Sequence, residues 1–151
     1  MTLVQRAAQF AAKAHDGQLR KYTNAPYYSH VEAVAHAVAA AGADETTIAA
    51  AYLHDVLEET NTTVDELTEA FGPGIAEIVV DLTNIYTAAA HPKLSRAQRK
   101  RLETERLAHI SPQAKIIKRA DIADNTLTIA ERDPGFAKVY LPEKEAMLKV
   151  L

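Results

Sequence analysis

The chain has 151 residues, a length that fits one domain with its own core, and its 48% hydrophobic and 25% charged residues are ordinary for a soluble globular protein. It has no cysteine, no apolar run of roughly 18 residues and no signal-peptide pattern, which excludes disulfides, thiolate metal sites and a membrane span. A net charge of −3 gives no reason to expect a nucleic-acid polymer as partner. We therefore expect a single cytoplasmic domain over residues 1–151, of open oligomeric state.

The first third of the chain has helical periodicity interrupted by one polar loop. Apolar residues over about 4–14 recur at helical spacing, and the polar stretch GQLRKYTNAPYY follows without such a period. Ser29 and Glu32 have the spacing of a capping box, which predicts a helix that begins there and runs to about residue 42. His30 is then expected in the first turn of this helix.

Cap residues divide the middle of the chain into further helices. Asp44 is expected to cap a helix over about 45–58, and Thr63 with Glu66 forms a second capping box before a short helix that ends at Gly72. Pro73 is expected to begin another helix, to roughly residue 84.

The last third also lacks any alternating strand pattern. A polar loop near residues 87–93 precedes a basic segment from Ser95 to Ala108. Ser111 and Pro112 are an N-cap and a first-turn proline for a long helix to about residue 130, and Pro142 is expected to break or restart the last helix. The sequence therefore predicts a single all-α domain.

A histidine next to an aspartate lies inside the apolar, helix-patterned stretch IAAAYLHDVLEE. Buried polar groups are costly unless they are paired or coordinated, so His54 and Asp55 call for an explanation. With His30 upstream and Asp121 downstream they make a four-ligand set of two imidazoles and two carboxylates. Such a set suits a divalent ion such as Mn, Fe, Zn or Mg.

Further polar side chains are expected near this set. On one continuous helix Glu58 and Glu59 follow His54 at about 40° and about 140°, over the same arc as Asp55. They are therefore candidates to orient a metal-activated water or to carry its proton.

On the late helix, Asn125 follows Asp121 by one turn and Asp124 flanks it. We expect Asp124 to lie at the surface or behind the ligands rather than to be a fifth ligand.

The same polar residues also have interpretations that involve no function. His54 and Asp55 alone fit a hydrogen-bonded structural pair, and the two glutamates fit a solvated helix end. The basic loop residues and the basic segment fit solvated charge as well as contacts to a phosphate or the rim of an anionic pocket. These basic residues are Arg20, Lys21, Lys93, Arg96, Arg99, Lys100 and Arg101.

The ordered set H…HD…D resembles the signature of the HD-domain phosphohydrolases, and more narrowly the small stand-alone form of the RelA/SpoT hydrolase domain. The likeness is found in the stretches FAAKAHDGQLRKYTNAPYYSH, AAYLHDVLEETNTTVDELTEAFG, IVVDLTN, PKLSRAQRKR and AKIIKRADIADN, from about Ala7 to Tyr140. The resemblance implies a helical bundle of about eight or more helices around one metal site. It also implies Mn²⁺-dependent removal of the 3′-pyrophosphate from guanosine tetra- and pentaphosphate.

The same resemblance assigns roles to individual residues. It implies metal ligation by His30, His54, Asp55 and Asp121, and water handling by Glu58 and Glu59. It implies that Arg20, Lys21, Asn125 and Tyr140 contact the nucleotide substrate.

The chain departs from the family pattern at four of its positions. Val31, Glu59, Ile122 and Thr126 stand where the family usually has proline, aspartate, lysine and leucine. The loss of the lysine charge at Ile122 bears on the identity of the substrate. It leaves open an HD phosphatase that releases orthophosphate from another nucleotide, such as a nucleoside monophosphate or a phosphorylated dinucleotide. A nucleotide-binding module without turnover is a second alternative.

Overall fold

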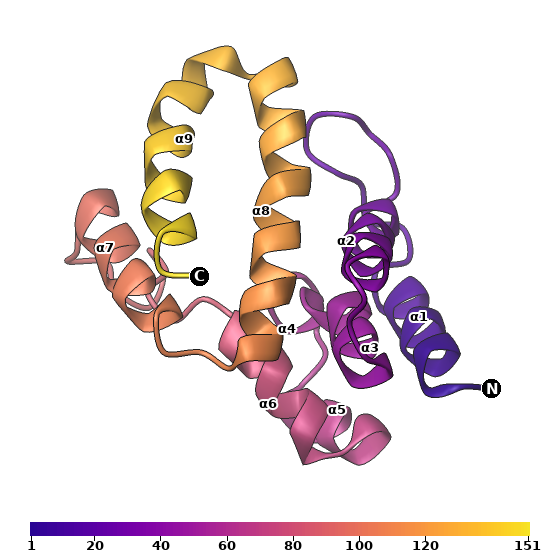
Figure 1. The fold of residues 1–151 in the computed structure, drawn as a ribbon. Helices are drawn as coiled ribbons and strands as arrows, with labels where there is room; N and C mark the ends of the chain where they lie inside the picture. Colours follow the sequence, from indigo (N-terminus) through magenta and orange to yellow (C-terminus); the bar gives the residue numbers. More distant parts are fainter.

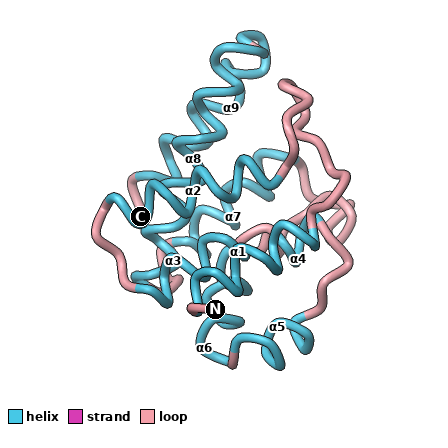
Figure 2. Tube along the Cα trace, turned by 90° about the vertical axis from the view of Figure 1, so that its right-hand side faces the viewer, coloured by secondary structure: helices cyan, strands magenta, loops and turns pink.

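The computed structural model describes residues 1–151 as nine α-helices joined by loops, without a β-strand (Figures 1 and 2). The helices are α1 (Leu3–Ala14), α2 (Tyr28–Ala40), α3 (Glu45–Leu53), α4 (Val56–Glu59), α5 (Val64–Phe71), α6 (Pro73–Leu82), α7 (Arg96–Leu107), α8 (Pro112–Arg132) and α9 (Pro134–Leu148). None of them combines the length and the apolar character that crossing a membrane requires. The expected all-α fold is confirmed.

Helix α3 lies at the centre of the core. It packs against α1, α2, α6 and α8, and its residues Ala49, Ala50, Ala51 and Leu53 are fully buried. A helix that is apolar all round is a buried helix, and alanine side chains let the neighbouring helices approach closely. The residues that follow the end of α3 are therefore placed inside the molecule.

Helices α8 and α9 form an antiparallel hairpin, drawn in orange and yellow in Figure 1. Asp133 ends α8 and also caps α9, where its side chain accepts a hydrogen bond from the Phe136 amide at 3.1 Å. The loop between α1 and α2 lies beside this turn, because the Tyr22 hydroxyl donates to the Asp133 carboxylate at 2.8 Å. This loop is thus held close to α8.

Three of the predicted helix starts are confirmed by their caps. The side chains of Asp44, Thr63 and Ser111 accept hydrogen bonds from the backbone amide three residues on. The short helix α5 ends at Gly72, whose φ of 86° is readily adopted only by glycine.

The capping box predicted at Ser29 is wrong. Helix α2 begins one residue earlier, after Tyr27, and the Ser29 hydroxyl donates back to the Pro26 carbonyl at 2.7 Å. The turn at Pro26 starts the helix without a side-chain cap. His30 nevertheless lies in the first turn, as expected.

The single helix predicted over 45–58 is two helices, broken at His54 and Asp55. The Ala51 carbonyl accepts from both the His54 amide (3.3 Å) and the His54 ring nitrogen Nδ1 (2.7 Å), instead of from the Asp55 amide. Asp55 then has φ −105° and ψ 0°, outside the helical region. The side-chain angles calculated for a continuous helix therefore do not hold.

The break predicted at Pro142 is also wrong, because α9 continues through it. Proline cannot donate the hydrogen bond that the Lys138 carbonyl would accept in a regular helix. Both residues lie on the exposed face of α9, so this carbonyl is free to bond to water.

Candidate metal centre

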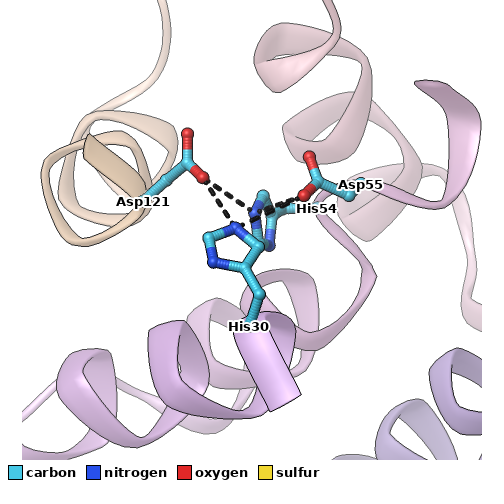
Figure 3. A group of neighbouring side chains, drawn as sticks. All are labelled: His30, His54, Asp55 and Asp121. Carbon is cyan, nitrogen blue, oxygen red and sulfur yellow. Dashed lines mark hydrogen bonds and ion pairs between the residues drawn. The ribbon is translucent and has the colours of Figure 1, made fainter. Parts of the chain in front are cut away.

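The four predicted ligands come together from three parts of the fold (Figure 3). His30 comes from the first turn of α2, His54 and Asp55 from the break between α3 and α4, and Asp121 from the middle of α8. One ligand atom of each lies within 4.8 Å of those of the others. All four residues are buried.

Both imidazole rings are held so that Nε2 points into the cluster. Nδ1 of His30 donates to Asp124 at 2.7 Å, and Nδ1 of His54 donates to the Ala51 carbonyl at 2.7 Å. A hydrogen bond at Nδ1 fixes the tautomer that leaves Nε2 as a ligand, as is common in metal sites. The expectation that Asp124 lies behind the ligands agrees with this geometry.

The spacing of the inward atoms fits one ion. Nε2 of His30 lies 3.0 Å from Oδ1 of Asp121 and 3.5 Å from Oδ2 of Asp55. Nε2 of His54 lies 3.2 Å and 3.3 Å from the same two oxygens. Bonds of about 2.0–2.2 Å to one metal place neighbouring ligands about 3.0–3.6 Å apart. The four residues therefore fit a divalent cation.

The electrostatics of the cluster also favour a cation. Burial opposes the charged form of His30, but hydrogen bonds to Asp121, Asp124 and Asp55 outweigh it and raise the pKa to about 11. For His54 burial is outweighed chiefly by the charge of Asp55, and the pKa rises to about 10. Burial works against ionisation of Asp55 and Asp121, yet their cationic neighbours hold both pKa values well below the usual range. Negative charge that attracts protons attracts a divalent ion in the same way.

The two glutamates line a polar cavity of about 180 Å³ beside this cluster, which we call the carboxylate cavity. Glu58 accepts a hydrogen bond from the Asn84 amide, and Glu59 accepts one from Gln18 at 3.4 Å. Burial and the charge of Asp55 raise the pKa of both carboxyl groups. A raised pKa suits a group that takes a proton from water near neutral pH.

The basic loop lines a second cavity, also of about 180 Å³, which we call the loop cavity. The Arg20 guanidinium lies 3.2 Å from Asp124 and 3.5 Å from the amide oxygen of Asn125, so it is tied to α8. Lys21 is exposed, and its ammonium group lies 5.3 Å from the centre of the Tyr22 ring. The loop cavity thus has cationic walls.

Asn125 and Tyr140 also lie where the sequence places them near the ligands. Asn125 donates to Asp121 at 3.1 Å and lines both cavities. Tyr140 is buried and lines the carboxylate cavity, and burial raises its pKa. All ten predicted site residues therefore lie in the metal cluster or in the two cavities.

Three further polar residues that the sequence pattern does not single out line the carboxylate cavity. Tyr27, at the end of the α1–α2 loop, donates to Asp55 at 2.7 Å. Lys118 forms an ion pair of 3.1 Å with Asp121, and Lys144 also lines the cavity. The two lysines could have been predicted from helical spacing, because Lys118 is three residues before Asp121 and Lys144 is four after Tyr140, which puts each pair on one helix face.

Other features of the molecule add nothing to this site. In the basic segment Arg96 is paired with Glu143 at 3.0 Å, Arg99 donates to the Leu94 carbonyl, and Lys93 is exposed. A larger hollow of about 520 Å³ lies between α2 and α8. Its lining is mainly apolar and contains no metal-ligand candidate.

Comparison with known proteins yields a family and named relatives. The HD domain family matches residues 7–138. The guanosine-3′,5′-bis(diphosphate) 3′-pyrophosphohydrolase MESH1 of Xenopus tropicalis is 38% identical over 122 residues, which cover 79% of this chain and 65% of that protein. Its Homo sapiens counterpart is 41% identical over 118 residues, covering 76% and 63%. The chain thus matches slightly less than two thirds of the length of these two relatives.

One solved structure extends the likeness to the whole fold. It is described as a metazoan ortholog of SpoT that hydrolyses ppGpp and plays a role in starvation responses. It is superposed with a TM-score of 0.85 and 28% sequence identity, over 99% of this chain and 85% of that chain. The family match, which includes all four clustered ligands, assigns this chain to the HD domain family.

Proposed function

We propose that this chain is a single HD hydrolase domain that removes the 3′-pyrophosphate from guanosine tetra- and pentaphosphate, releasing GDP or GTP. The observation that carries the proposal is the buried His30–His54–Asp55–Asp121 cluster, which opens onto a cavity lined by two further glutamates. The named activity of the relatives, 36–41% identical among the MESH1 proteins, supports the same reaction.

Mn²⁺ is the ion that we propose for the cluster. Two imidazole nitrogens and two carboxylate oxygens suit manganese, and the absence of sulfur ligands disfavours softer ions. When bound, such an ion polarises a phosphoryl oxygen and lowers the pKa of a water ligand.

Glu58 and Glu59 are proposed to handle the attacking water. Both carboxylates line the cavity beside the ligands, and the hydrogen bonds from Asn84 and Gln18 fix their positions. One carboxylate takes a proton as the water oxygen attacks the phosphorus next to the ribose 3′ oxygen. The bond from that phosphorus to the 3′ oxygen breaks, pyrophosphate leaves, and the 3′ oxygen is protonated.

The rest of the nucleotide is proposed to lie along the loop cavity. Each cavity is smaller than the roughly 300–1,000 Å³ of typical ligand pockets, so a nucleotide with two diphosphates has to use both. The two cavities share Tyr27, Asn125 and Ile129, which makes them neighbours. Arg20 and Lys21 are proposed to hold the base and its phosphates. Asn125, which lines both cavities, and Tyr140, which lines the carboxylate cavity, are proposed to contact the rest of the substrate.

Product analysis tests this proposal. Purified protein is incubated with guanosine tetraphosphate and Mn²⁺, and the products are separated by anion-exchange chromatography. We expect GDP and pyrophosphate in equal amounts. Release of orthophosphate from other nucleotides, with guanosine tetraphosphate left intact, would favour the broader HD phosphatases. Binding without turnover would favour a nucleotide-binding module.

A further inference from the structure

A half-buried lysine without an acidic partner, Lys144, lies on the α9 wall of the carboxylate cavity. The Lys144 ammonium lies 5.1 Å from the centre of the Tyr140 ring and 3.8 Å from the sulfur of Met147. No carboxylate is within salt-bridge distance. Its neighbour Glu143 is engaged by Arg96, and Asp121 is engaged by Lys118.

The surroundings of Lys144 make its charge costly. Burial, together with the charges of Lys118 and Lys100, lowers its pKa to about 8, although the charges of Asp121 and Glu143 act in the opposite direction. A cation that is partly removed from water and has no counter-ion costs free energy, and groups with such shifted pKa values cluster at functional sites. Of these lysines, Lys118 of α8 and Lys144 of α9 line the cavity, and Lys118 is already paired with Asp121.

The cavity that Lys144 lines also contains the apolar residue at the position of the usual family lysine. Ile122 lines the same cavity, is 2% exposed and carries no charge. The cavity thus has carboxylates around the metal ligands and positive charge on the α9 wall. A ligand that satisfies both needs negatively charged oxygens at each end, one set for the metal and one for the lysine.

We propose that Lys144 binds the outer phosphate of a pyrophosphoryl group whose inner phosphate lies at the metal centre. This inference rests on the proposed function for the identity of the substrate, but the contact itself requires only a ligand that carries pyrophosphate. Lys144 is thus assigned as a binding residue that distinguishes a diphosphate from a single phosphate.

The test measures binding of inorganic pyrophosphate to the Mn²⁺-loaded protein by titration calorimetry. Lys144→Met removes the charge and keeps the length of the side chain, and Lys138→Met is the matched control, an exposed lysine on the same helix. We expect Lys144→Met to weaken pyrophosphate binding at least about tenfold, the effect of losing a charge-assisted contact, and Lys138→Met to leave it unchanged.

Two further readings separate this role from a structural one. Lys144→Met should bind Mn²⁺ as the wild type does and should unfold at an equal or higher temperature, because an unpaired, half-buried charge is removed. Unchanged pyrophosphate binding in Lys144→Met, or an equal loss in Lys138→Met, would overturn the proposal. The binding test does not depend on turnover. If the product analysis shows no hydrolysis of guanosine tetraphosphate, but Lys144→Met still weakens pyrophosphate binding, the proposed function is refuted and the role of Lys144 is not.

Discussion

The two walls of the carboxylate cavity differ in how their polar atoms are partnered. On the wall of metal ligands, Asp55 accepts a hydrogen bond from Tyr27, and Asp121 is paired with Lys118 and accepts a hydrogen bond from Asn125. On the α9 wall, Lys144 has no carboxylate partner. The first wall is held in place by ion pairs and hydrogen bonds within the protein, whereas the charge of Lys144 has only a thioether and an aromatic ring as neighbours. The comparison shows a preorganised set of ligands and an uncompensated charge in one cavity.

The largest effect is expected from removing a metal ligand. Asp55→Ala removes one ligand and leaves both histidines without one of their carboxylates. We expect Mn²⁺ binding and hydrolysis to fall below detection, with the helix content by circular dichroism close to that of the wild type. Asp65→Ala, at an exposed aspartate of α5, is the control and should retain both. Metal-dependent hydrolysis by Asp55→Ala would contradict the ligand assignment.

A change beside the ligands should separate chemistry from metal binding. Glu58→Gln removes a proton acceptor, and we expect kcat to fall by about 10²–10⁴-fold with Mn²⁺ affinity unchanged. Glu69→Gln, an exposed position of α5, serves as control. Because burial raises the pKa of Glu58, wild-type kcat should decline on the acid side at a higher pH than an ordinary glutamate would give. An unchanged kcat in Glu58→Gln would exclude it as the base.

Asp124 accepts a hydrogen bond from a ligand but is not a ligand itself, so its loss should weaken Mn²⁺ binding less than the loss of Asp55. Asp124→Ala frees Nδ1 of His30 and should weaken Mn²⁺ binding by about 10–100-fold without abolishing it. Calorimetric titration of Mn²⁺ measures this, with the exposed Asp16→Ala as control. Equal affinities in the Asp124→Ala variant and the wild type would mean that the His30 ring is oriented by packing alone.

The smallest expected effect is that of the Lys144 charge on the free energy of unfolding of the protein. The folded state holds the Lys144 pKa at about 8, below the 10.5 of an unperturbed lysine, so the unfolded state binds more protons between these values. The free energy of unfolding therefore rises with pH across this window, and the penalty is fully present below about pH 8. Lys144→Met should be more stable than the wild type at about pH 7, and this difference should shrink towards about pH 10. A difference independent of pH would refute a charge penalty at Lys144.

Most of the fold could be predicted because its signals are local. Apolar periodicity and the caps at Asp44, Thr63 and Ser111 act within one helical turn. The predictions at His54 and Pro142 were wrong because side-chain contacts and solvent exposure, rather than local sequence, determine where these helices end. The break at His54 depends on a ring nitrogen that bonds to the Ala51 carbonyl, and α9 tolerates Pro142 because its freed carbonyl faces water.

The candidate site shows the same division. The ligands could be proposed from the type and order of His30, His54, Asp55 and Asp121 along the chain. The partners of those ligands could not, since Asp124 reaches His30 across 94 residues and Tyr27 reaches Asp55 across 28. Only the packing of α2 and of the α1–α2 loop against α8 and the α3–α4 break brings them together.

We propose that one divalent ion is bound by residues of three different helical segments. Diffraction data collected at the manganese absorption edge, from crystals grown with Mn²⁺, would locate this ion. We expect a single anomalous peak within about 2.0–2.5 Å of Nε2 of His30, Nε2 of His54 and one carboxylate oxygen each of Asp55 and Asp121. A fully occupied peak elsewhere, or none at the cluster, would contradict this proposal.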